Sequence, residues 1–247
     1  MADENTLDAQ ALLKNIGLRH RTGNVSFDAQ AFHYLNLSFS ISGEDLILRK
    51  KVRNKMLSGE TGNYVDVGAL HPFDSSNTYL FYLFGWRGVC IDSNPKSAAW
   101  FSTWRPKDKY IHAAISQKPR DMYFAEHKNN MGMSRVFEVD EKIAEGFGPP
   151  EKVSATRLDT ILASSFQSGQ VIDIMSVDVE RMELDVLKSN DWGRYRPRHL
   201  CIEEHAAQVM DPNESLMVKY MIDQGYKVSA VAPPNIFFSD TAHHPIP

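Results

Sequence analysis

The chain has 247 residues, 43% of them hydrophobic, and a formal net charge of −4 at neutral pH. This length and composition suit one large α/β domain with a single sizeable core. The negative charge argues against nucleic acid as the main partner, because phosphate backbones bind basic surfaces. The sequence contains no apolar run near the roughly 20 residues that span a bilayer, and its acidic start is unlike a secretory signal. We therefore expect a cytoplasmic protein without a transmembrane segment.

The first half of the chain is predicted to alternate helices with strands. After a helical N-terminal extension over residues 1–41, Ser42-Gly43-Glu44-Asp45 has the pattern of a capping box that opens a helix. A second helix runs from about residue 74 to Gly85 and is expected to bury Leu80, Phe81, Leu83 and Phe84. A third begins at Asn94-Pro95. The strands expected in this half cover residues 63–67, 89–91 and 110–115.

The second half continues this alternation and ends in a hairpin. Residues 127–152 are interpreted either as an exposed excursion or as a lid over a pocket. Asp211-Pro212-Asn213-Glu214 predicts a helix from there to Gly225. The other expected elements are helices over 158–162 and 182–188, strands over 171–177 and 199–202, and a hairpin over 226–238 that turns at Pro233-Pro234-Asn235.

This order of elements predicts a Rossmann-like α/β fold. Strands that alternate with helices form a doubly wound sheet, and the closing hairpin adds an antiparallel edge. We assign the domain to residues 42–240 and a tail to residues 241–247.

Two consecutive strands end in acidic residues, and a glycine turn follows the first of them. Asp66 precedes Gly68, and Asp92 ends the next strand. A dinucleotide site would have Gly-x-Gly-x-x-Gly here, but Leu70 and Pro72 occupy the second and third glycine positions. S-adenosylmethionine carries no phosphate; its ammonium can pair with Asp66, and its ribose diol can bind Asp92. Either acid alone has an ordinary structural explanation, but together they predict a site for this cofactor.

Neighbouring residues complete the predicted cofactor site. Ala69 follows the turn glycine, Ser93 follows Asp92, and Ala114 lies where a small side chain leaves room for a flat adenine ring. Asp178, at the end of the fourth strand, is a further cofactor candidate. His71 either reaches the substrate or the cofactor carboxylate, or has a structural role.

Four segments, taken in order, resemble the FkbM-type S-adenosylmethionine-dependent methyltransferases. They are residues 42–48, 66–78, 85–95 and 178–187. The resemblance extends over residues 42–240 and implies a fold of the class I methyltransferase type, with methyl transfer to an oxygen, often a hydroxyl of a sugar or polyketide. Two positions depart from the family pattern, since many members have glycine at Pro72 and most have it at Arg181. The Arg181 side chain either contacts substrate or points to solvent.

Acidic residues gather after the fourth and fifth strands, where a doubly wound sheet places its reaction site. They are Asp178, Glu180, Glu203 and Glu204, and His205 follows them. Oxygen ligands of this kind suit Mg²⁺ or Mn²⁺. We hypothesise that Asp178 with Glu203 or Glu204 holds the ion and that His205 or Glu180 is the base. The alternative is that these acids only stabilise a helix N-terminus and start a loop.

The sequence therefore predicts an O-methyltransferase that acts on a hydroxyl of a sugar or glycolipid. A metal-dependent glycosyltransferase, with Asp178-x-Glu180 at a nucleotide sugar, is the alternative enzyme, but it leaves Asp66 and Asp92 unexplained. A non-catalytic cofactor-binding subunit is the third interpretation. The acceptor stays open, as does the possibility of a homo-oligomer.

Overall fold

The computed structural model describes residues 36–139, 141–143, 145–167, 169–204, 214–241 and 243. The described residues from Ser38 onward form one compact unit. The predicted helical extension over residues 1–41 thus lies mostly outside the described residues, and its described part, residues 36–41, contains no helix. Among the described residues, no helix has the length and apolar character needed to cross a membrane.

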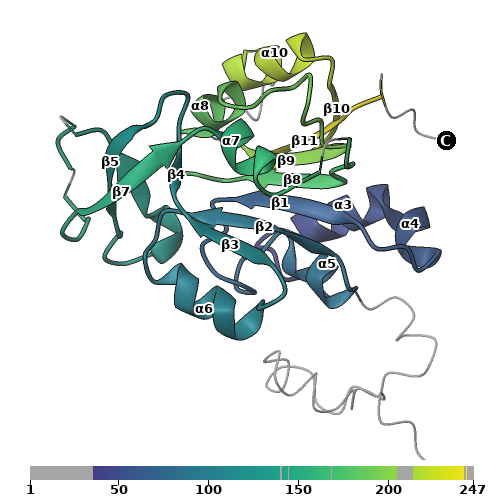
Figure 1. Cartoon of the computed structure of the whole chain (residues 1–247), viewed down its shortest axis with the longest axis horizontal. Coiled ribbons are helices and arrows are strands. Elements are labelled where there is room, and N and C mark those ends of the chain that lie inside the picture. The colour runs from purple at the N-terminus through teal and green to yellow at the C-terminus, as the bar shows by residue number, and fades with distance from the viewer. Residues whose placement is uncertain are drawn as a thin grey trace, which may run out of the picture. The chain divides into compact units, whose positions relative to one another are not determined.

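A seven-stranded sheet forms the centre of the compact unit (Figure 1). The strands are β1 (Asn63–Val67), β2 (Arg87–Asp92), β3 (Lys109–His112), β8 (Ile174–Val177), β9 (His199–Glu203), β10 (Lys227–Ala232) and β11 (Asn235–Ser239). They lie in the order β10-β11-β9-β8-β1-β2-β3. The five strands from β9 to β3 are parallel, while β11 runs antiparallel to both β9 and β10. The predicted doubly wound sheet with an antiparallel C-terminal hairpin is confirmed.

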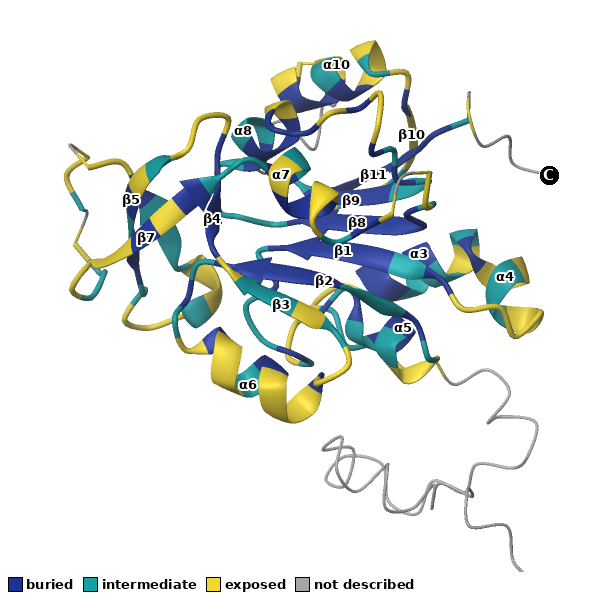
Figure 2. Cartoon of the chain, in the orientation of Figure 1, coloured by how far each residue is buried: buried dark blue, intermediate teal, exposed yellow. Residues whose placement is uncertain are grey.

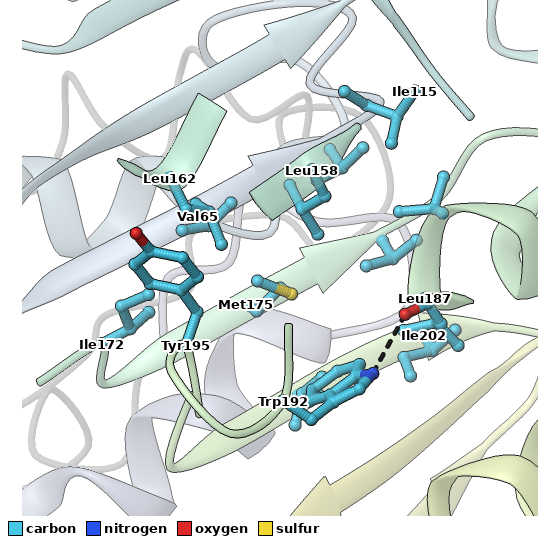
Figure 3. Close-up of a cluster of buried hydrophobic side chains, with 14 of the residues drawn as sticks. Val65, Ile115, Leu158, Leu162, Ile172, Met175, Leu187, Trp192, Tyr195 and Ile202 are labelled. Carbon is cyan, nitrogen blue, oxygen red and sulfur yellow. Dashed lines mark hydrogen bonds between the residues drawn. The ribbon is translucent and has the colours of Figure 1, made fainter. Parts of the chain in front are cut away.

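Helices cover both faces of this sheet because its strands are apolar on both sides. In β1, Val65 and Val67 face a cluster that includes α7, α8 and α10, whereas Tyr64 faces one that includes α3, α5 and α6. Figure 2 shows the central strands as buried, and Figure 3 shows the first cluster, where the Trp192 indole N–H donates to the Leu187 carbonyl. The helices are α3 (Glu44–Lys51), α4 (Arg53–Leu57), α5 (Tyr79–Leu83), α6 (Ser97–Trp104), α7 (Leu158–Ala163), α8 (Glu183–Lys188) and α10 (Leu216–Asp223).

A second sheet of four strands was not predicted. Its strands are β4 (Ala114–Ile115), β5 (Arg120–Ala125), β6 (Arg135–Phe137) and β7 (Glu151–Thr156), in the order β4-β7-β5-β6. It has its own small core, formed by Ala114, Met122, Phe124, Val153 and Ala155. Three short pieces of the segment 127–152 have regular structure: the 3₁₀-helix η2 (Met131–Met133), β6, and the first two residues of β7. The other described residues of the segment lie outside the helices and the strands of these sheets.

The strand predicted over residues 110–115 is wrong as a single element. β3 ends at His112 in the large sheet, and β4 begins at Ala114 in the small one. The run from Ile111 to Ile115 is apolar except for His112, and hydrophobic patterning does not reveal a change of sheet within such a run.

The predicted capping box does not form. The N-cap of α3 is Gly43, with φ +84° and no side-chain cap. Glu44 and Asp45 are buried instead. Asp45 accepts hydrogen bonds from the Phe39 N–H and from the hydroxyls of Ser38 and Ser40, while Glu44 accepts one from the Asn235 amide. These acids anchor the segment before α3 and the edge of the sheet.

Two other helices also differ from their predicted extents. Helix α5 begins at Tyr79, and it buries Leu80 and Phe81 but leaves Leu83 and Phe84 more than half exposed, at 53% and 56%. Helix α10 begins at Leu216 after the cap Ser215, whose hydroxyl accepts a hydrogen bond from the Val218 N–H. Of the predicted start at residues 211–214, residues 211–213 lie outside the described residues, and Glu214 lies in a turn.

Candidate active site

A cavity of about 480 Å³ lies at the carboxyl ends of β1, β2, β8 and β9. The strand order reverses between β1 and β8, and ligands of doubly wound sheets bind at such a point. The volume falls within the range of about 300–1,000 Å³ typical of small-molecule sites. The wall includes residues 66–71, 74–77, 91–93, 113–115, 129–136 and 178–180, together with Phe124, Ser176, Met182 and Glu203.

Gly68 occupies the point where the β1 turn crosses the end of β8. Its φ is +84°, and a Cβ at this position would lie 1.6 Å from the carbonyl oxygen of Asp178. The N–H groups of Gly68 and Ala69 both donate to the Ile91 carbonyl, at 2.9 and 3.1 Å, which binds the turn to β2. The glycine is therefore required by the chain's own close packing, in addition to any approach of a ligand.

Asp92 ends β2 with both carboxylate oxygens engaged by backbone. One accepts the Leu70 N–H at 2.8 Å, and the other accepts the Asn94 N–H at 2.7 Å. Burial raises the pKa of Asp92 to about 6, although these two hydrogen bonds favour the charged form. A carboxylate has about four lone-pair sites, so Asp92 keeps acceptor capacity toward the cavity that it lines. Ser93 and Ala114 lie on the same cavity wall.

Asp66 takes part in a buried polar network behind the cavity. Its carboxylate accepts a hydrogen bond from the Thr78 hydroxyl at 2.5 Å, and Thr78 accepts one in turn from the Arg105 guanidinium at 3.0 Å. Arg105, itself 1% exposed, also forms an ion pair with Asp108 at 2.7 Å and donates to the Pro72 carbonyl. Burial raises the pKa of Asp66, against the opposing effect of Arg105. This network holds the loop between β1 and α5, and Asp66 also borders the cavity.

Three acids meet at the ends of β8 and β9. Carboxylate oxygens of Asp178, Glu180 and Glu203 lie within 4.8 Å of one another, as ligands of one metal ion would. Burial and the neighbouring Glu203 carboxylate raise the pKa of Asp178 well above its usual range. Burial, Glu203 and Glu183 raise the pKa of Glu180 to about 7. Oε2 of Glu203 is buried without a hydrogen-bond partner among the described residues.

Glu204 is not in this group, and the structure does not describe His205. Glu204, predicted as a possible metal ligand, accepts a hydrogen bond from the Ser215 hydroxyl, and its N–H donates to the Pro234 carbonyl. It does not line the cavity, and Glu180 occupies the third position of the acidic cluster. His205, predicted as a base, lies outside the described residues.

The loop after β8 holds two residues in left-handed conformations. The φ angles of Glu180 and Arg181 are 54° and 85°, a region that costs roughly 1–2 kcal/mol for a residue with a Cβ. Glu183 holds this loop, because its Oε1 accepts hydrogen bonds from the N–H groups of Val179 and Arg181. Glycine, the usual family residue at position 181, would adopt this φ without strain. The Arg181 side chain is exposed and borders a smaller adjoining hollow with Arg135 and Glu138.

Residues 129–136 form a wall of the cavity. They belong to the segment 127–152, for which the sequence left open an exposed excursion or a lid over a pocket, and none of them was among the predicted site residues. They carry η2 and the start of β6, and Arg135 among them weakens the rise in the pKa of Glu180. The available signal was the length of the segment 127–152, since long irregular segments in compact domains often border functional sites.

The sheet order, the antiparallel hairpin and the cavity at the point of strand reversal define a class I methyltransferase-like fold. The methyltransferase FkbM domain matches residues 66–228, more than half of the chain. The chain belongs to the FkbM methyltransferase family, whose cofactor is S-adenosylmethionine. The alternatives of a glycosyltransferase and of a non-catalytic subunit are not supported.

Solved structures with a similar course of the chain are distant in sequence. The alignment with monomeric WbdD has a TM-score of 0.44 and 11% sequence identity. It covers 81% of this chain and 41% of the WbdD chain. A candidate caffeoyl-CoA O-methyltransferase from Staphylococcus aureus aligns with a TM-score of 0.44 and 10% identity, and the alignment covers 94% of this chain and 92% of that one. A candidate O-methyltransferase from Klebsiella pneumoniae aligns with a TM-score of 0.41 and 9% identity, and the alignment covers 93% of this chain and 92% of that one. No protein with a curated description matches the chain.

Proposed function

We propose that this methyltransferase acts on oxygen and transfers its methyl group to a hydroxyl of a carbohydrate or glycolipid. The observation that supports this most is the arrangement of carboxylates on two sides of one cavity. Asp92 lies at the end of β2, and the acidic cluster of Asp178, Glu180 and Glu203 lies at the ends of β8 and β9. One side suits the ribose of the cofactor, and the other suits a hydroxyl that must lose a proton.

The residues at the β1 and β2 ends fit the cofactor. The remaining lone pairs of Asp92 can accept hydrogen bonds from the ribose hydroxyls. Ser93 and Ala114 border the same side of the cavity, and the small Ala114 leaves room for a planar base. When bound, S-adenosylmethionine supplies an electrophilic methyl carbon on a cationic sulfur. The acidic cluster favours a positive charge in the cavity, because its carboxylates repel one another.

Glu180 is the residue we assign as the base. An alcohol loses its proton as the new carbon–oxygen bond forms, and a base with a pKa near the working pH assists this transfer best. The pKa of Glu180 is about 7, so a substantial fraction of this carboxylate is ionised at neutral pH. Glu180 has a strained backbone, with a φ of 54°, and Glu183 holds its loop by accepting hydrogen bonds from the N–H groups of Val179 and Arg181. The acceptor hydroxyl would have to lie within hydrogen-bond reach of Glu180.

The acidic cluster also fits a divalent cation. Three carboxylate oxygens within 4.8 Å of one another form a donor set of the type that Mg²⁺ and Mn²⁺ bind. A cation held by Asp178, Glu180 and Glu203 would lower the pKa values of these three carboxylates and could itself acidify a bound substrate hydroxyl, so it is the alternative to Glu180 as the base. Exhaustive chelation that leaves the rate unchanged would remove the cation from the proposal without affecting the base.

An acceptor screen with labelled S-adenosylmethionine tests the proposal. Monosaccharides, oligosaccharides and glycolipids are offered to the wild-type protein and to Glu180→Gln. We expect Glu180→Gln to lower kcat by about 100-fold or more and to leave the affinity for S-adenosylhomocysteine within about twofold. The control is Asp223→Asn, an exposed acid on α10, which should match the wild type. Methylation of amines but not of hydroxyls, or an unchanged kcat in Glu180→Gln, would contradict the proposal.

A further inference from the structure

His71 is a cavity residue with a fixed ring and one nitrogen available to a ligand. We propose that its Nε2–H donates a hydrogen bond to the α-carboxylate of the cofactor, an inference that rests on the proposed binding of S-adenosylmethionine in this cavity. His71 lies three residues after Gly68, in the loop that forms the cavity wall beside β1.

The hydrogen bonds of the loop select the tautomer of the ring. Nδ1 lies 3.1 Å from the Asp74 backbone nitrogen and 3.4 Å from that of Phe73, and both N–H groups donate to it. A nitrogen that accepts these bonds carries no hydrogen, so the hydrogen of a neutral ring is on Nε2. Burial lowers the pKa of His71, which keeps the ring neutral at pH 7. His71 is therefore a donor at Nε2 and an acceptor at Nδ1.

Aromatic neighbours hold the ring in this orientation. Phe73 meets it edge to face, with ring centroids 4.5 Å apart, and Trp100 of α6 lies against it at 5.2 Å. Among the described residues, Nε2 has no hydrogen-bond partner, although the residue is half-buried. A fixed, partly desolvated donor on a cavity wall gains most from a ligand acceptor.

The charges around the cavity indicate which part of the cofactor this acceptor is. Asp178, Glu180 and Glu203 gather at the ends of β8 and β9, where they would repel a carboxylate but attract an ammonium or a sulfonium. Arg135 is the one Lys or Arg side chain that the described residues contribute to the wall, and it is paired with Glu141 at 2.9 Å.

The loop from His71 to Asn77 lines the cavity with polar groups and contributes a single acid. The Asn77 amide donates to Ser176 at 3.0 Å, and the one acid of the loop, Asp74, is exposed. The α-carboxylate is accordingly expected beside His71, and the cationic groups toward the acidic cluster.

Calorimetric titration with two ligands tests this assignment. The ligands are S-adenosylhomocysteine and its decarboxylated analogue, 5′-(3-aminopropyl)thioadenosine, which differ only in the carboxylate. His71→Asn keeps an acceptor where Nδ1 is but lacks the outer donor; His71→Gln keeps a donor at the reach of Nε2. We expect His71→Asn to bind S-adenosylhomocysteine about tenfold more weakly, about 1.4 kcal/mol, and to bind the analogue as the wild type does. His71→Gln should recover most of the lost affinity.

The contrary outcomes are distinct. If His71→Asn weakens both ligands equally, or binds S-adenosylhomocysteine as tightly as the wild type, His71 only shapes the loop and the assignment is wrong. Thermal unfolding of each variant shows whether it is folded. If His71→Asn is misfolded, His71→Gln decides the question: the assignment requires that it still bind S-adenosylhomocysteine more tightly than the analogue by the same factor as the wild type. If the wild type binds neither ligand, the proposed function itself fails.

Discussion

Gly68 is the residue that the fold constrains most directly at the site. A Cβ there would lie 1.6 Å from the Asp178 carbonyl oxygen, and the φ of +84° is unfavourable for any other residue. We expect Gly68→Ala to lower the free energy of unfolding by at least about 3 kcal/mol, measured by urea denaturation. Gly59→Ala is the matched control, because Gly59 has φ +77° and no atom within 4 Å of the added Cβ. Gly59→Ala should lower the free energy of unfolding by only about 1 kcal/mol. An equal loss of unfolding free energy in the two variants would contradict this account.

Arg181 is expected to be a residue whose replacement by glycine stabilises the protein. Its φ of 85° suits glycine, and its side chain is exposed. Arg181→Gly should raise the free energy of unfolding by up to about 1 kcal/mol, since the relief of strain exceeds the added entropy of the unfolded chain. Lys188→Gly, on the exposed surface of α8, should instead cost about 1 kcal/mol. A loss of stability in Arg181→Gly would show that the arginine side chain makes a stabilising contact.

Individual site residues were predictable where the sequence alone determines their place in the sheet. Asp66 and Asp92 lie at the ends of β1 and β2, Asp178 directly follows β8, and all three line the cavity. The hydrogen bond from Thr78 to Asp66, and the one from Arg105 to Thr78, were not predictable, because these residues are far apart in the sequence. The same holds for Glu204, which follows Glu203 by one residue and therefore faces the opposite way, toward Ser215.

At the scale of elements, buried parallel strands were the most predictable part of the fold. Their apolar runs are short and are separated by helices and turns, a pattern typical of doubly wound sheets. The small sheet was not predictable for a physical reason. β5 carries charged residues at Arg120 and Asp121, and its main partner β7 lies about 30 residues further along the chain, so local patterning contains little information about the pairing.

The start of α10 gives a prediction at the element scale. The Ser215 hydroxyl accepts the Val218 N–H at 3.1 Å and donates to Glu204. Ser215→Ala removes the cap of the Val218 N–H and the hydroxyl that donates to Glu204, so it should lower the free energy of unfolding by about 1–2 kcal/mol. Ser102→Ala, on the exposed side of α6, should stay within about 0.5 kcal/mol of the wild type. Urea denaturation measures both, and equal values would mean that Ser215 does not cap the helix.

At the scale of the whole molecule, the site carboxylates set a dependence of stability on pH. The pKa values of Asp92 and Glu180 are raised to about 6 and about 7, and that of Asp178 is also raised. The folded state therefore binds protons more tightly than the unfolded state, and the free energy of unfolding falls as pH rises from the ordinary carboxyl values of 3.8 and 4.5 to about 6 for Asp92 and about 7 for Glu180. The shift at buried Asp92 corresponds to roughly 3 kcal/mol, and the contribution of the more exposed Glu180 is smaller than its shift alone implies, because solvent screens it. The lowered pKa of His71 acts in the opposite direction near pH 6.

Thermal unfolding at pH 5.5 and pH 8 measures this dependence. We expect a lower Tm at pH 8, and a smaller difference between the two values in Glu180→Gln. Mg²⁺ should raise the Tm mainly at pH 8 if the acidic cluster binds a cation, since only the ionised carboxylates are ligands. A Tm that rises from pH 5.5 to pH 8 would contradict the mutual repulsion of these acids.

The central claim is that S-adenosylmethionine binds in the cavity at the ends of β1 and β2, with its ribose on Asp92. Calorimetric titration of S-adenosylhomocysteine into the wild type and into Asp92→Asn tests it most directly, with Asp223→Asn as control. We predict a Kd on the order of micromolar for the wild type and the control, and an affinity at least about tenfold weaker for Asp92→Asn. No binding to the wild type, or an equal Kd in all three proteins, would contradict the account.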